Sequence, residues 1–361
     1  MVLTQRVLNR TTLERQLLLS RSSLSPLSAV ERLVAVQGQE PNSPYYSLWT
    51  RLDSFTHDDL TSLMYGKRVV RASLIRGTQH LATADDYLWL RPMMQTRLRA
   101  ARQSAFGKDT ATVDLEELAE LARKHLSGRT LTRPQLAALL AERWPDVEKM
   151  TLGWSAQMTL PLVHTPPNGT WNKGGATPFT LAEEWLERPL EWSAPVELLI
   201  ERYLATYGPA GVMDIQMWSG LTRLREVVAG MDLRHYTDET GRDLVDLPSA
   251  TLASGEEDAP VRFLPYFDNL VVAFADRSRL MTPEQRKQIC VGSMVYPTFL
   301  VDGTVGGMWD LKDGTLVMQP FAPLRASAAA DLAEEGARLL AFAGFEGGSI
   351  TWQTPSGSST T

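Results

Sequence analysis

The feature that most constrains the fold of this chain is a unit of short helices followed by a β-hairpin, because the unit occurs three times. The first copy has expected helices at residues 10–22, 45–52 and 57–65, and β-like segments at 69–74 and 79–83. Short helices closed by a two-stranded ribbon describe a winged helix, in which one helix and the ribbon usually contact nucleic acid.

The same pattern recurs twice further along the chain. In the second copy, Thr132 and Pro134 mark the start of a helix, and Asn168-Gly169 between two β-like runs is a strong hairpin signal. In the third copy, Gly220 lies in the turn of a helix-turn-helix. Three copies indicate a tandem array, although they differ too much for a fixed period. The other elements expected here are helices at 84–104, 113–126, 133–144, 147–160, 195–207, 212–218 and 221–229, and strands at 233–236 and 243–247.

We therefore predict an α+β, mainly helical fold: three tandem winged-helix motifs in a C-shaped array, with a C-terminal β-rich closing segment. In that segment we expect strands at 271–274 and 296–301, a tight turn at Asp302-Gly303 and a helix at 326–343. The predicted regions are a first winged-helix region at 1–106, a second at 107–190, a third with the β-hairpin segment at 191–348, and a disordered tail at 349–361.

Size and composition exclude several classes of protein. The 361 residues lack a run of about 18 uncharged apolar residues and an N-terminal signal-peptide pattern, so we expect no membrane partner. Cys290 is the only cysteine, which excludes an internal disulfide and a thiolate metal cluster. The five histidines are scattered without ligand spacing, so we expect no metal site.

The net charge of −6 conceals an asymmetry along the chain. Residues 1–105 contain 14 Lys and Arg against 8 Asp and Glu, whereas the remainder contains 22 against 34. Because electrostatic fields act over about 8–10 Å in physiological salt, a basic N-terminal third can form a phosphate-attracting surface despite the acidic total. An ordinary solvated surface is the alternative, and charge alone does not decide.

The triplet Gln37-Gly38-Gln39 follows an apolar run with helical spacing and precedes Pro41. Gly38 suits a helix exit because it tolerates a left-handed cap, and Pro41 restricts Glu40 to extended geometry. Two residues that are two positions apart share a side only where the backbone is extended. From the triplet alone, capping of the helix end is the commoner role for such glutamines.

Motifs over most of the chain give this arrangement a family resemblance. It resembles the AlkZ-type winged-helix DNA glycosylases, which open alkylation-derived interstrand crosslinks and whose type member protects an azinomycin-producing bacterium from its own product. The matching stretches are Ala35-Val36-Gln37-Gly38-Gln39-Glu40-Pro41, Ile75-Arg76-Gly77-Thr78-Gln79-His80-Leu81, Arg202-Tyr203-Leu204, Tyr207-Gly208-Pro209-Ala210, Leu264-Pro265-Tyr266-Phe267-Asp268-Asn269, Ala275-Asp276-Arg277-Ser278-Arg279 and Val301-Asp302-Gly303-Thr304-Val305-Gly306-Gly307-Met308-Trp309.

The resemblance implies both the catalytic residues and the activity. The family's catalytic glutamine pair falls on Gln37 and Gln39, and glutamine rather than aspartate at 39 indicates the crosslink-specialised branch. The residue between them is usually apolar, so Gly38 departs from the pattern. The implied protein is a cytoplasmic, nucleoid-associated bacterial glycosylase and a monomer. It would hydrolyse cationic N7-alkylated purines from double-stranded DNA and unhook interstrand crosslinks, without a cofactor or lyase activity, and so give self-resistance to a natural product such as azinomycin.

The chemistry explains why two amides could suffice. A purine alkylated at N7 is already cationic and leaves readily, so the enzyme needs to place a water and stabilise an oxocarbenium-like sugar. A glutamine oxygen can accept a hydrogen bond from that water, but it cannot deprotonate water at neutral pH. Glu40 is a possible base, although a carboxylate at a helix end more often serves as a cap.

Seven residues are candidates for DNA contact. The basic residues around the first ribbon would contact phosphates, and the tip of the 302–308 hairpin would probe the minor groove. Each has an ordinary alternative as a surface charge, a core residue or part of a sheet, and Asp268-Asn269 fits a structural turn better than a substrate contact. The candidates are Lys67, Arg68, Arg71, Arg76, His80, Thr304 and Val305.

A second hypothesis of a different class is a non-enzymatic winged-helix DNA-binding regulator or a drug-sequestering protein. Tandem helix-turn-helix units are far commoner in binding proteins than in enzymes, so fold alone favours this alternative.

Overall fold

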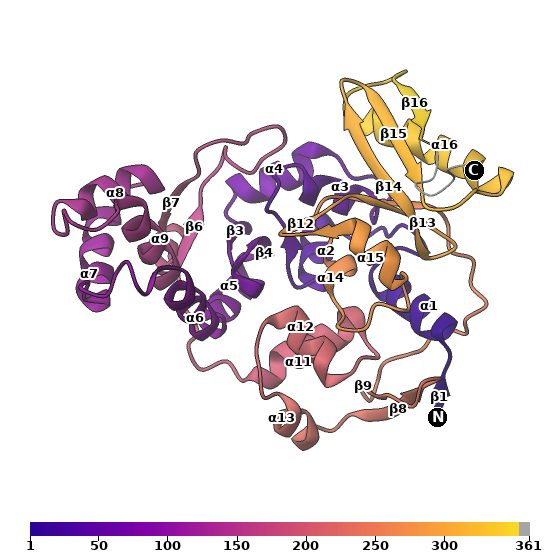
Figure 1. Cartoon of the computed structure of the whole chain (residues 1–361), viewed down its shortest axis with the longest axis horizontal. Helices are drawn as coiled ribbons and strands as arrows, with labels where there is room; N and C mark the ends of the chain where they lie inside the picture. The colour runs from indigo at the N-terminus through magenta and orange to yellow at the C-terminus, as the bar shows by residue number, and fades with distance from the viewer. Residues whose placement is uncertain (354–361) are drawn as a thin grey trace, which may run out of the picture.

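The computed structural model describes residues 1–353 of the chain. Its first third contains the helices and ribbon expected there, with two differences (Figure 1). The first helix begins at Gln5, where the Thr4 side chain accepts a hydrogen bond from the Val7 N–H, and ends at Arg15. The elements are β1 (Val2–Leu3), α1 (Gln5–Arg15), α2 (Pro26–Arg32), β2 (Val36–Gln37), α3 (Ser43–Trp49), α4 (His57–Tyr65), β3 (Val69–Ser73), η1 (Ile75–Gly77), β4 (Gln79–Thr83), α5 (Ala84–Met93) and α6 (Gln95–Phe106).

The second difference is that the helix expected at 84–104 is two helices, α5 and α6, which meet at Met94. Pro92 explains the break because it lacks the N–H that would bond to the Leu88 carbonyl. That carbonyl instead accepts a hydrogen bond from the Glu191 N–H, at 2.8 Å.

A six-stranded sheet joins the ribbons of the first and second regions. Its strand order is β2-β4-β3-β6-β7-β5, and β3 meets β6 where Arg71 lies opposite His164. The hairpin expected at Asn168-Gly169 is wrong, because β6 pairs with β7 beyond a loop of residues 165–177. Pro166 and Pro167 lack the N–H groups that a ribbon would need there. The second region consists of α7 (Leu115–Leu126), β5 (Leu131–Thr132), α8 (Arg133–Ala141), α9 (Lys149–Thr159), β6 (Leu162–His164), β7 (Pro178–Leu181) and α10 (Ala182–Leu186).

The third region contains the expected helices and ribbon. Gly220, at φ 75°, ends α12 in the left-handed conformation that glycine accommodates without strain. The ribbon gains a third strand, because β1 pairs in parallel with β8. The elements are α11 (Val196–Tyr207), α12 (Val212–Ser219), α13 (Arg225–Gly230), β8 (Arg234–Asp238) and β9 (Asp243–Asp246).

The C-terminal segment forms a five-stranded sheet in the order β10-β13-β14-β15-β16, packed with α16. The strand expected at 271–274 is wrong: α14 forms at Asn269–Val272, and the Asp268 side chain caps it by accepting from the Leu270 N–H. Part of the expected tail is also wrong, since β16 pairs with β15, while residues 354–361 lie outside the described residues. The elements are β10 (Arg262–Leu264), α14 (Asn269–Val272), α15 (Pro283–Ile289), β11 (Cys290–Val291), β12 (Met294–Val295), β13 (Thr298–Val301), β14 (Thr304–Lys312), β15 (Thr315–Pro320), α16 (Ala326–Phe342) and β16 (Ser349–Trp352).

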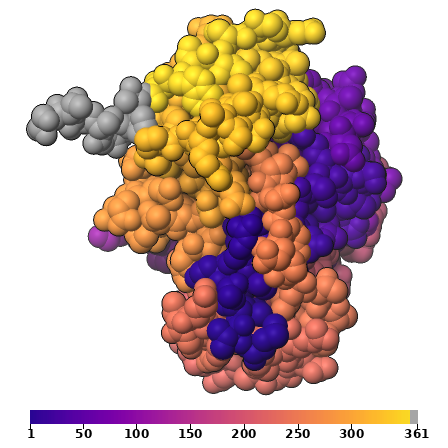
Figure 2. All heavy atoms as spheres, turned by 90° about the vertical axis from the view of Figure 1, so that its right-hand side faces the viewer, coloured from indigo at the N-terminus to yellow at the C-terminus, as the bar shows by residue number. Residues whose placement is uncertain are grey.

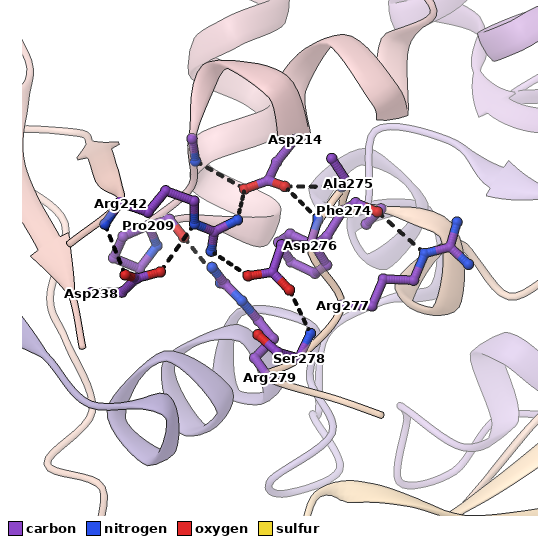
Figure 3. A network of polar contacts seen from close by, with 12 residues as sticks. Pro209, Asp214, Asp238, Arg242, Phe274, Ala275, Asp276, Arg277, Ser278 and Arg279 are labelled. Carbon is purple, nitrogen blue, oxygen red and sulfur yellow. Dashed lines mark hydrogen bonds and ion pairs between the residues drawn. The ribbon is translucent and has the colours of Figure 1, made fainter. Parts of the chain in front are cut away.

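Ion pairs connect distant parts of the chain. Figure 2 shows the indigo N-terminal segment between later segments of the chain. Arg15 of this segment forms a buried ion pair with Asp246 at 2.8 Å. Figure 3 shows a second network, in which Arg242 contacts Asp214, Asp238 and Asp276. The third region and the C-terminal segment are therefore fixed against each other.

The tandem winged-helix array stays a prediction, because the helices and ribbons alone do not establish it. The ribbons of the first two expected copies are parts of one sheet rather than separate wings. Among residues 1–353, no helix is both long enough and apolar enough to cross a membrane.

Candidate active site

The backbone of the glutamine triplet is extended rather than a helix cap. Helix α2 ends at Arg32, and the left-handed residue that follows it is Val34, at φ 66°, instead of the expected Gly38. Val36 and Gln37 then pair with β4, opposite Leu81 and His80. This extended geometry brings the side chain of Gln37 back to the backbone of residue 39.

Both carboxamides are oriented by hydrogen bonds. The Gln37 side chain is 5% exposed; its Oε1 accepts from the Gln39 N–H at 2.8 Å, and its Nε2 donates to Thr78 Oγ1 at 3.2 Å. Gln39 is exposed, and its Oε1 accepts from the Gln79 N–H at 3.3 Å. A carbonyl oxygen has two lone pairs, so each oxygen can accept one further hydrogen bond.

Glycine fits between the two glutamines because no space exists for a side chain. A Cβ atom at Gly38 would lie 2.6 Å from Leu81 Cδ1. The Gly38 carbonyl accepts a hydrogen bond from Arg71 Nε at 2.9 Å. Leu81 thus occupies the volume that an apolar residue between the glutamines would need.

Arg71 supports this triplet from inside the protein and is a correction to the predicted DNA contacts. It is 5% exposed, and besides the Gly38 carbonyl it contacts Asn168 Oδ1 at 2.9 Å and His164 Nδ1 at 3.3 Å. Burial lowers the pKa of Arg71 to about 10, still above neutral pH. Its donors face protein groups, so we remove Arg71 from the proposed phosphate contacts.

The side chains of His80 and Arg76 also contact the protein interior. His80 is fully buried, and burial lowers its pKa to about 3, which keeps the imidazole neutral; its proposed DNA contact is therefore withdrawn. Arg76 is half-buried and donates to the Trp218 carbonyl at 2.8 Å. This bond connects the first ribbon to α12 and leaves Arg76 as a structural contact in this conformation.

The two remaining basic candidates, Lys67 and Arg68, differ in whether another side chain already binds them. Lys67 forms an exposed ion pair with Glu187 at 3.2 Å and lies over the Trp185 ring. Arg68 is exposed, and its side chain forms no hydrogen bond or ion pair within residues 1–353. Arg68 is therefore the candidate most available to a phosphate.

The Asp302-Gly303 turn forms as expected, but it packs against α1. Asp302 contacts the Arg10 guanidinium, and the Gly303 carbonyl accepts from Asn9 Nδ2 at 2.8 Å. Val305 is 3% exposed, so its proposed groove contact is withdrawn, while Thr304 is exposed. The hairpin is anchored on α1 instead of reaching outward.

An exposed apolar hairpin that sequence analysis missed lies elsewhere, at β11–β12. Val291 is 51% and Met294 is 37% exposed. Two contacts connect this hairpin to the glutamine site. The Phe267 N–H donates a hydrogen bond to the Val295 carbonyl at 3.0 Å. The residue before Phe267, Tyr266, lines the same small cavity as Gln37. Its only sequence signal is a turn, Gly292-Ser293, between short β-like pairs.

Glu40 has the ordinary role of a helix cap. Its Oε2 accepts hydrogen bonds from the Asn42 and Ser43 N–H groups, at 2.8 and 3.0 Å, at the start of α3. Burial raises the pKa of the Glu40 carboxyl above 4.5. The structural interpretation of Glu40 is thus confirmed.

A buried ion pair lies behind Gln37. Both Arg51 guanidinium Nη atoms contact the Asp268 carboxylate at 3.0 Å, and both side chains are at most 2% exposed. Gln37, Arg51 and Asp268 line a cavity of only about 10 Å³. The structural role expected for Asp268 is confirmed, since it caps α14 and pairs with Arg51.

Comparison with known proteins places this site in a family. The family model described as "DNA glycosylase AlkZ-like" matches residues 30–342, which include Gln37 and Gln39. The chain belongs to the AlkZ-like DNA glycosylase family. A curated AlkZ-like relative, the "Interstrand DNA cross-link repair glycosylase" of Streptomyces sahachiroi, is 26% identical over 336 residues, covering 86% of this chain and 88% of the relative.

The fold agrees with a solved AlkZ-like structure. The Streptomyces sahachiroi DNA glycosylase AlkZ superposes with a TM-score of 0.79 at 21% identity, covering 98% of this chain and all of that one. As an AlkZ-like protein, the chain is a DNA glycosylase, an enzyme that acts on DNA. Within residues 1–353, no group of three His, Cys, Asp or Glu side chains could hold a metal ion.

Proposed function

We propose that this AlkZ-like enzyme is a monofunctional glycosylase that releases cationic N7-alkylated purines from duplex DNA and unhooks interstrand crosslinks. The role would be self-resistance to a DNA-alkylating natural product such as azinomycin, in a cytoplasmic monomer. Family membership favours this hypothesis over a non-enzymatic regulator or drug-sequestering protein. The name of the Streptomyces sahachiroi relative supports the crosslink substrate.

The observation that carries the proposal is the fixed glutamine pair beside an accessible surface. Gln39 is exposed, whereas Gln37 is held by Thr78 and by the backbone of residue 39. Because these partners orient the carboxamides before substrate binds, the amide dipoles need little reorganisation during reaction.

In the proposed reaction, a water attacks the anomeric carbon as the bond to the cationic purine breaks. The electron pair of the glycosidic bond neutralises the purine, and the two glutamine oxygens position the water and face the positive charge on the sugar. The water then loses a proton to bulk solvent, leaving an abasic site. No lysine hydrogen-bonds to Gln37 or Gln39 within residues 1–353, which supports hydrolysis without a Schiff base.

The shallow setting of the pair suits a tethered base. Most glycosylases extrude the target into a deep pocket, but a crosslinked base cannot leave its partner strand. The cavity beside Gln37 has about the volume of one water molecule, so no nucleobase could enter there. Attack from the exposed side of Gln39 would leave the lesion attached to both strands until hydrolysis.

DNA contacts are proposed at two exposed elements. Arg68 would contact a phosphate, while Val291 and Met294 on the β11–β12 hairpin would take the groove role first assigned to the 302–308 turn, since apolar side chains can wedge between base steps. Lys67 and Thr304 are secondary candidates because they remain partly or fully exposed.

The test uses duplex DNA containing N7-methylguanine and, separately, a site-specific interstrand crosslink. Base release is scored as strand cleavage after hot alkali, and unhooking as separation of strands on a denaturing gel. Gln37→Ala and Gln39→Ala should each lose base release, while the exposed control Gln353→Ala should keep it. No release by the wild-type enzyme, or unchanged release by both glutamine variants, would refute the proposal.

A further inference from the structure

An aromatic pocket of about 330 Å³ lies next to the glutamine site. Its volume is within the usual range for small-molecule pockets, about 300–1,000 Å³. Pro265 and Tyr266 line both this pocket and the small cavity beside Gln37. Glu40, the residue after Gln39, also lines it. The pocket is therefore adjacent to the reacting surface but separate from the glutamine amides.

Five aromatic side chains contribute to its walls: Tyr46, Trp171, Tyr266, Trp309 and Phe345. Tyr46 contacts the rings of Trp171 and Trp309, at centroid distances of 5.2 and 5.7 Å. The Trp309 indole is fixed because its Nε1–H donates to the Leu264 carbonyl at 2.9 Å. Trp171 is backed by His57, stacked at 4.0 Å. These contacts hold the ring surfaces in place.

The same pocket is acidic. Glu40, Asp310 and Asp313 line it, and none of its lining residues is Lys or Arg. Lys312 neutralises part of this charge through an ion pair with Asp310 at 3.2 Å. Burial and the nearby carboxylates of Asp310 and Glu40 raise the pKa of the Tyr266 hydroxyl.

Acidic walls beside the active site of a DNA-binding enzyme restrict what can occupy the pocket. A phosphate would be repelled by three carboxylates, and a neutral purine would gain stacking but no electrostatic attraction. A flat cation gains both, because aromatic faces attract positive charge and the attraction strengthens when the cation is desolvated.

We propose that this pocket binds the cationic ring of an alkylated purine, through stacking on Trp171 and Tyr266 and attraction to Asp310 and Asp313. This proposal deepens and rests on the proposed function, because it assigns recognition of the lesion's charge to a site distinct from the catalytic amides. The pocket selects cationic purines by binding, and Gln37 and Gln39 then carry out the hydrolysis.

The test measures binding of 7-methylguanosine and of guanosine to the full chain without DNA, by isothermal titration calorimetry. The buffer is acidic enough to keep the N1 proton of 7-methylguanosine, so that its base is cationic. The cationic nucleoside should bind roughly tenfold more tightly than guanosine, the size expected for a partly desolvated cation–π contact. Equal affinities would overturn the proposal.

Two variants locate the binding. Trp171→Ala should weaken binding of 7-methylguanosine, whereas Trp192→Ala, at a site 61% exposed, should not. Because Trp171 packs on buried neighbours, the surface pair Asp310→Asn with Asp313→Asn provides a charge test that spares the core. It should remove the preference for the cation, while Asp109→Asn with Asp331→Asn should retain it. An unchanged preference in the Asp310 and Asp313 variant would also overturn the proposal.

Gln39→Ala separates this inference from the proposed function. The variant should keep nucleoside binding and lose base release from DNA. Base release by the wild-type enzyme without a preference for the cationic nucleoside would refute the pocket alone. A cationic preference without any base release would refute the glycosylase proposal alone.

Discussion

The position between the two glutamines offers the sharpest test of how the proposed catalytic pair is held. In Gly38→Ala, the new Cβ would lie 2.6 Å from Leu81 Cδ1, whereas apolar carbons pack at about 3.5–4.0 Å. Leu81 is fully buried, so it has to move by roughly 1 Å within a packed core. Gly38 does not have a positive φ, so alanine adds no backbone strain.

We expect Gly38→Ala to lower the free energy of unfolding by about 1–2 kcal/mol. Overpacking of this kind destabilises the folded state by about 1–3 kcal/mol. Alanine also makes the unfolded chain less flexible than glycine does, which stabilises the folded state by about 0.4–1 kcal/mol. Base release should slow as well, because Gln37 and Gln39 shift relative to each other. Gly230→Ala is the matched control, because a Cβ there meets no atom within 4 Å.

A double-mutant cycle with Leu81→Ala decides whether this contact is responsible. Leu81→Ala alone should cost about 2–5 kcal/mol through the cavity it leaves. If the Cβ and Leu81 compete for the same space, the double variant should be more stable than the sum predicts, by about 1–2 kcal/mol, and should regain part of the rate. Urea unfolding and single-turnover base release measure the two effects. Additivity within about 0.5 kcal/mol would show that Leu81 is not what excludes a side chain from position 38.

Three further predictions concern DNA binding, the buried ion pair and pH. Arg68→Ala should weaken binding to undamaged duplex and reduce the slope of log affinity against log salt by about 1, whereas an unchanged slope would remove Arg68 from the DNA surface. Asp268→Asn should cost about 3–5 kcal/mol in urea unfolding by leaving the Arg51 charge buried and unpaired, while the exposed Asp313→Asn should be near neutral. Burial lowers the pKa of His80 from 6.5 to about 3 in the folded chain, so between these pH values the unfolded chain binds more protons. The free energy of unfolding should therefore fall as the pH drops below 6.5, with a contribution from His80 of up to about 1.4 kcal/mol per pH unit. His80→Asn should flatten that dependence, and an equally steep loss of stability in the variant would contradict the assignment.

Local signals in the sequence predicted many of the elements. Thr56 and Asp59 form the capping box that starts α4 at His57, and Thr132 with Gln135 does the same for α8. The helices expected at 57–65 and 133–144 are found because the groups that start them are three residues apart and the chemistry of a helix start is local. The glutamine triplet is recognised only through the family resemblance, because its neighbours alone favour a helix cap.

Long-range partners account for what could not be predicted. Arg71 looks like a surface charge on a ribbon, but its contacts Gly38, His164 and Asn168 lie 33 to 97 positions away. The apolar run at 271–274 fits a strand or a helix, and the side chain of Asp268 selects the helix by capping it. The acidic pocket is also invisible in sequence, because it joins residues near 40, 171, 266 and 310.

The distribution of charge around Gln39 limits how a duplex could approach it. Glu40, Asp310 and Asp313 repel phosphates on one side. The exposed Arg68 directly precedes β3, the strand that pairs with β4, and Gln37 pairs with β4 from its other side. The DNA backbone should therefore lie toward the ribbon, with the damaged base directed toward the carboxylates. In that orientation a positive charge on the purine has two favourable effects. It makes the base a good leaving group, and it is attracted to the carboxylates of the acidic pocket. An undamaged purine provides neither, which explains on physical grounds how an enzyme with two neutral amides could spare intact DNA.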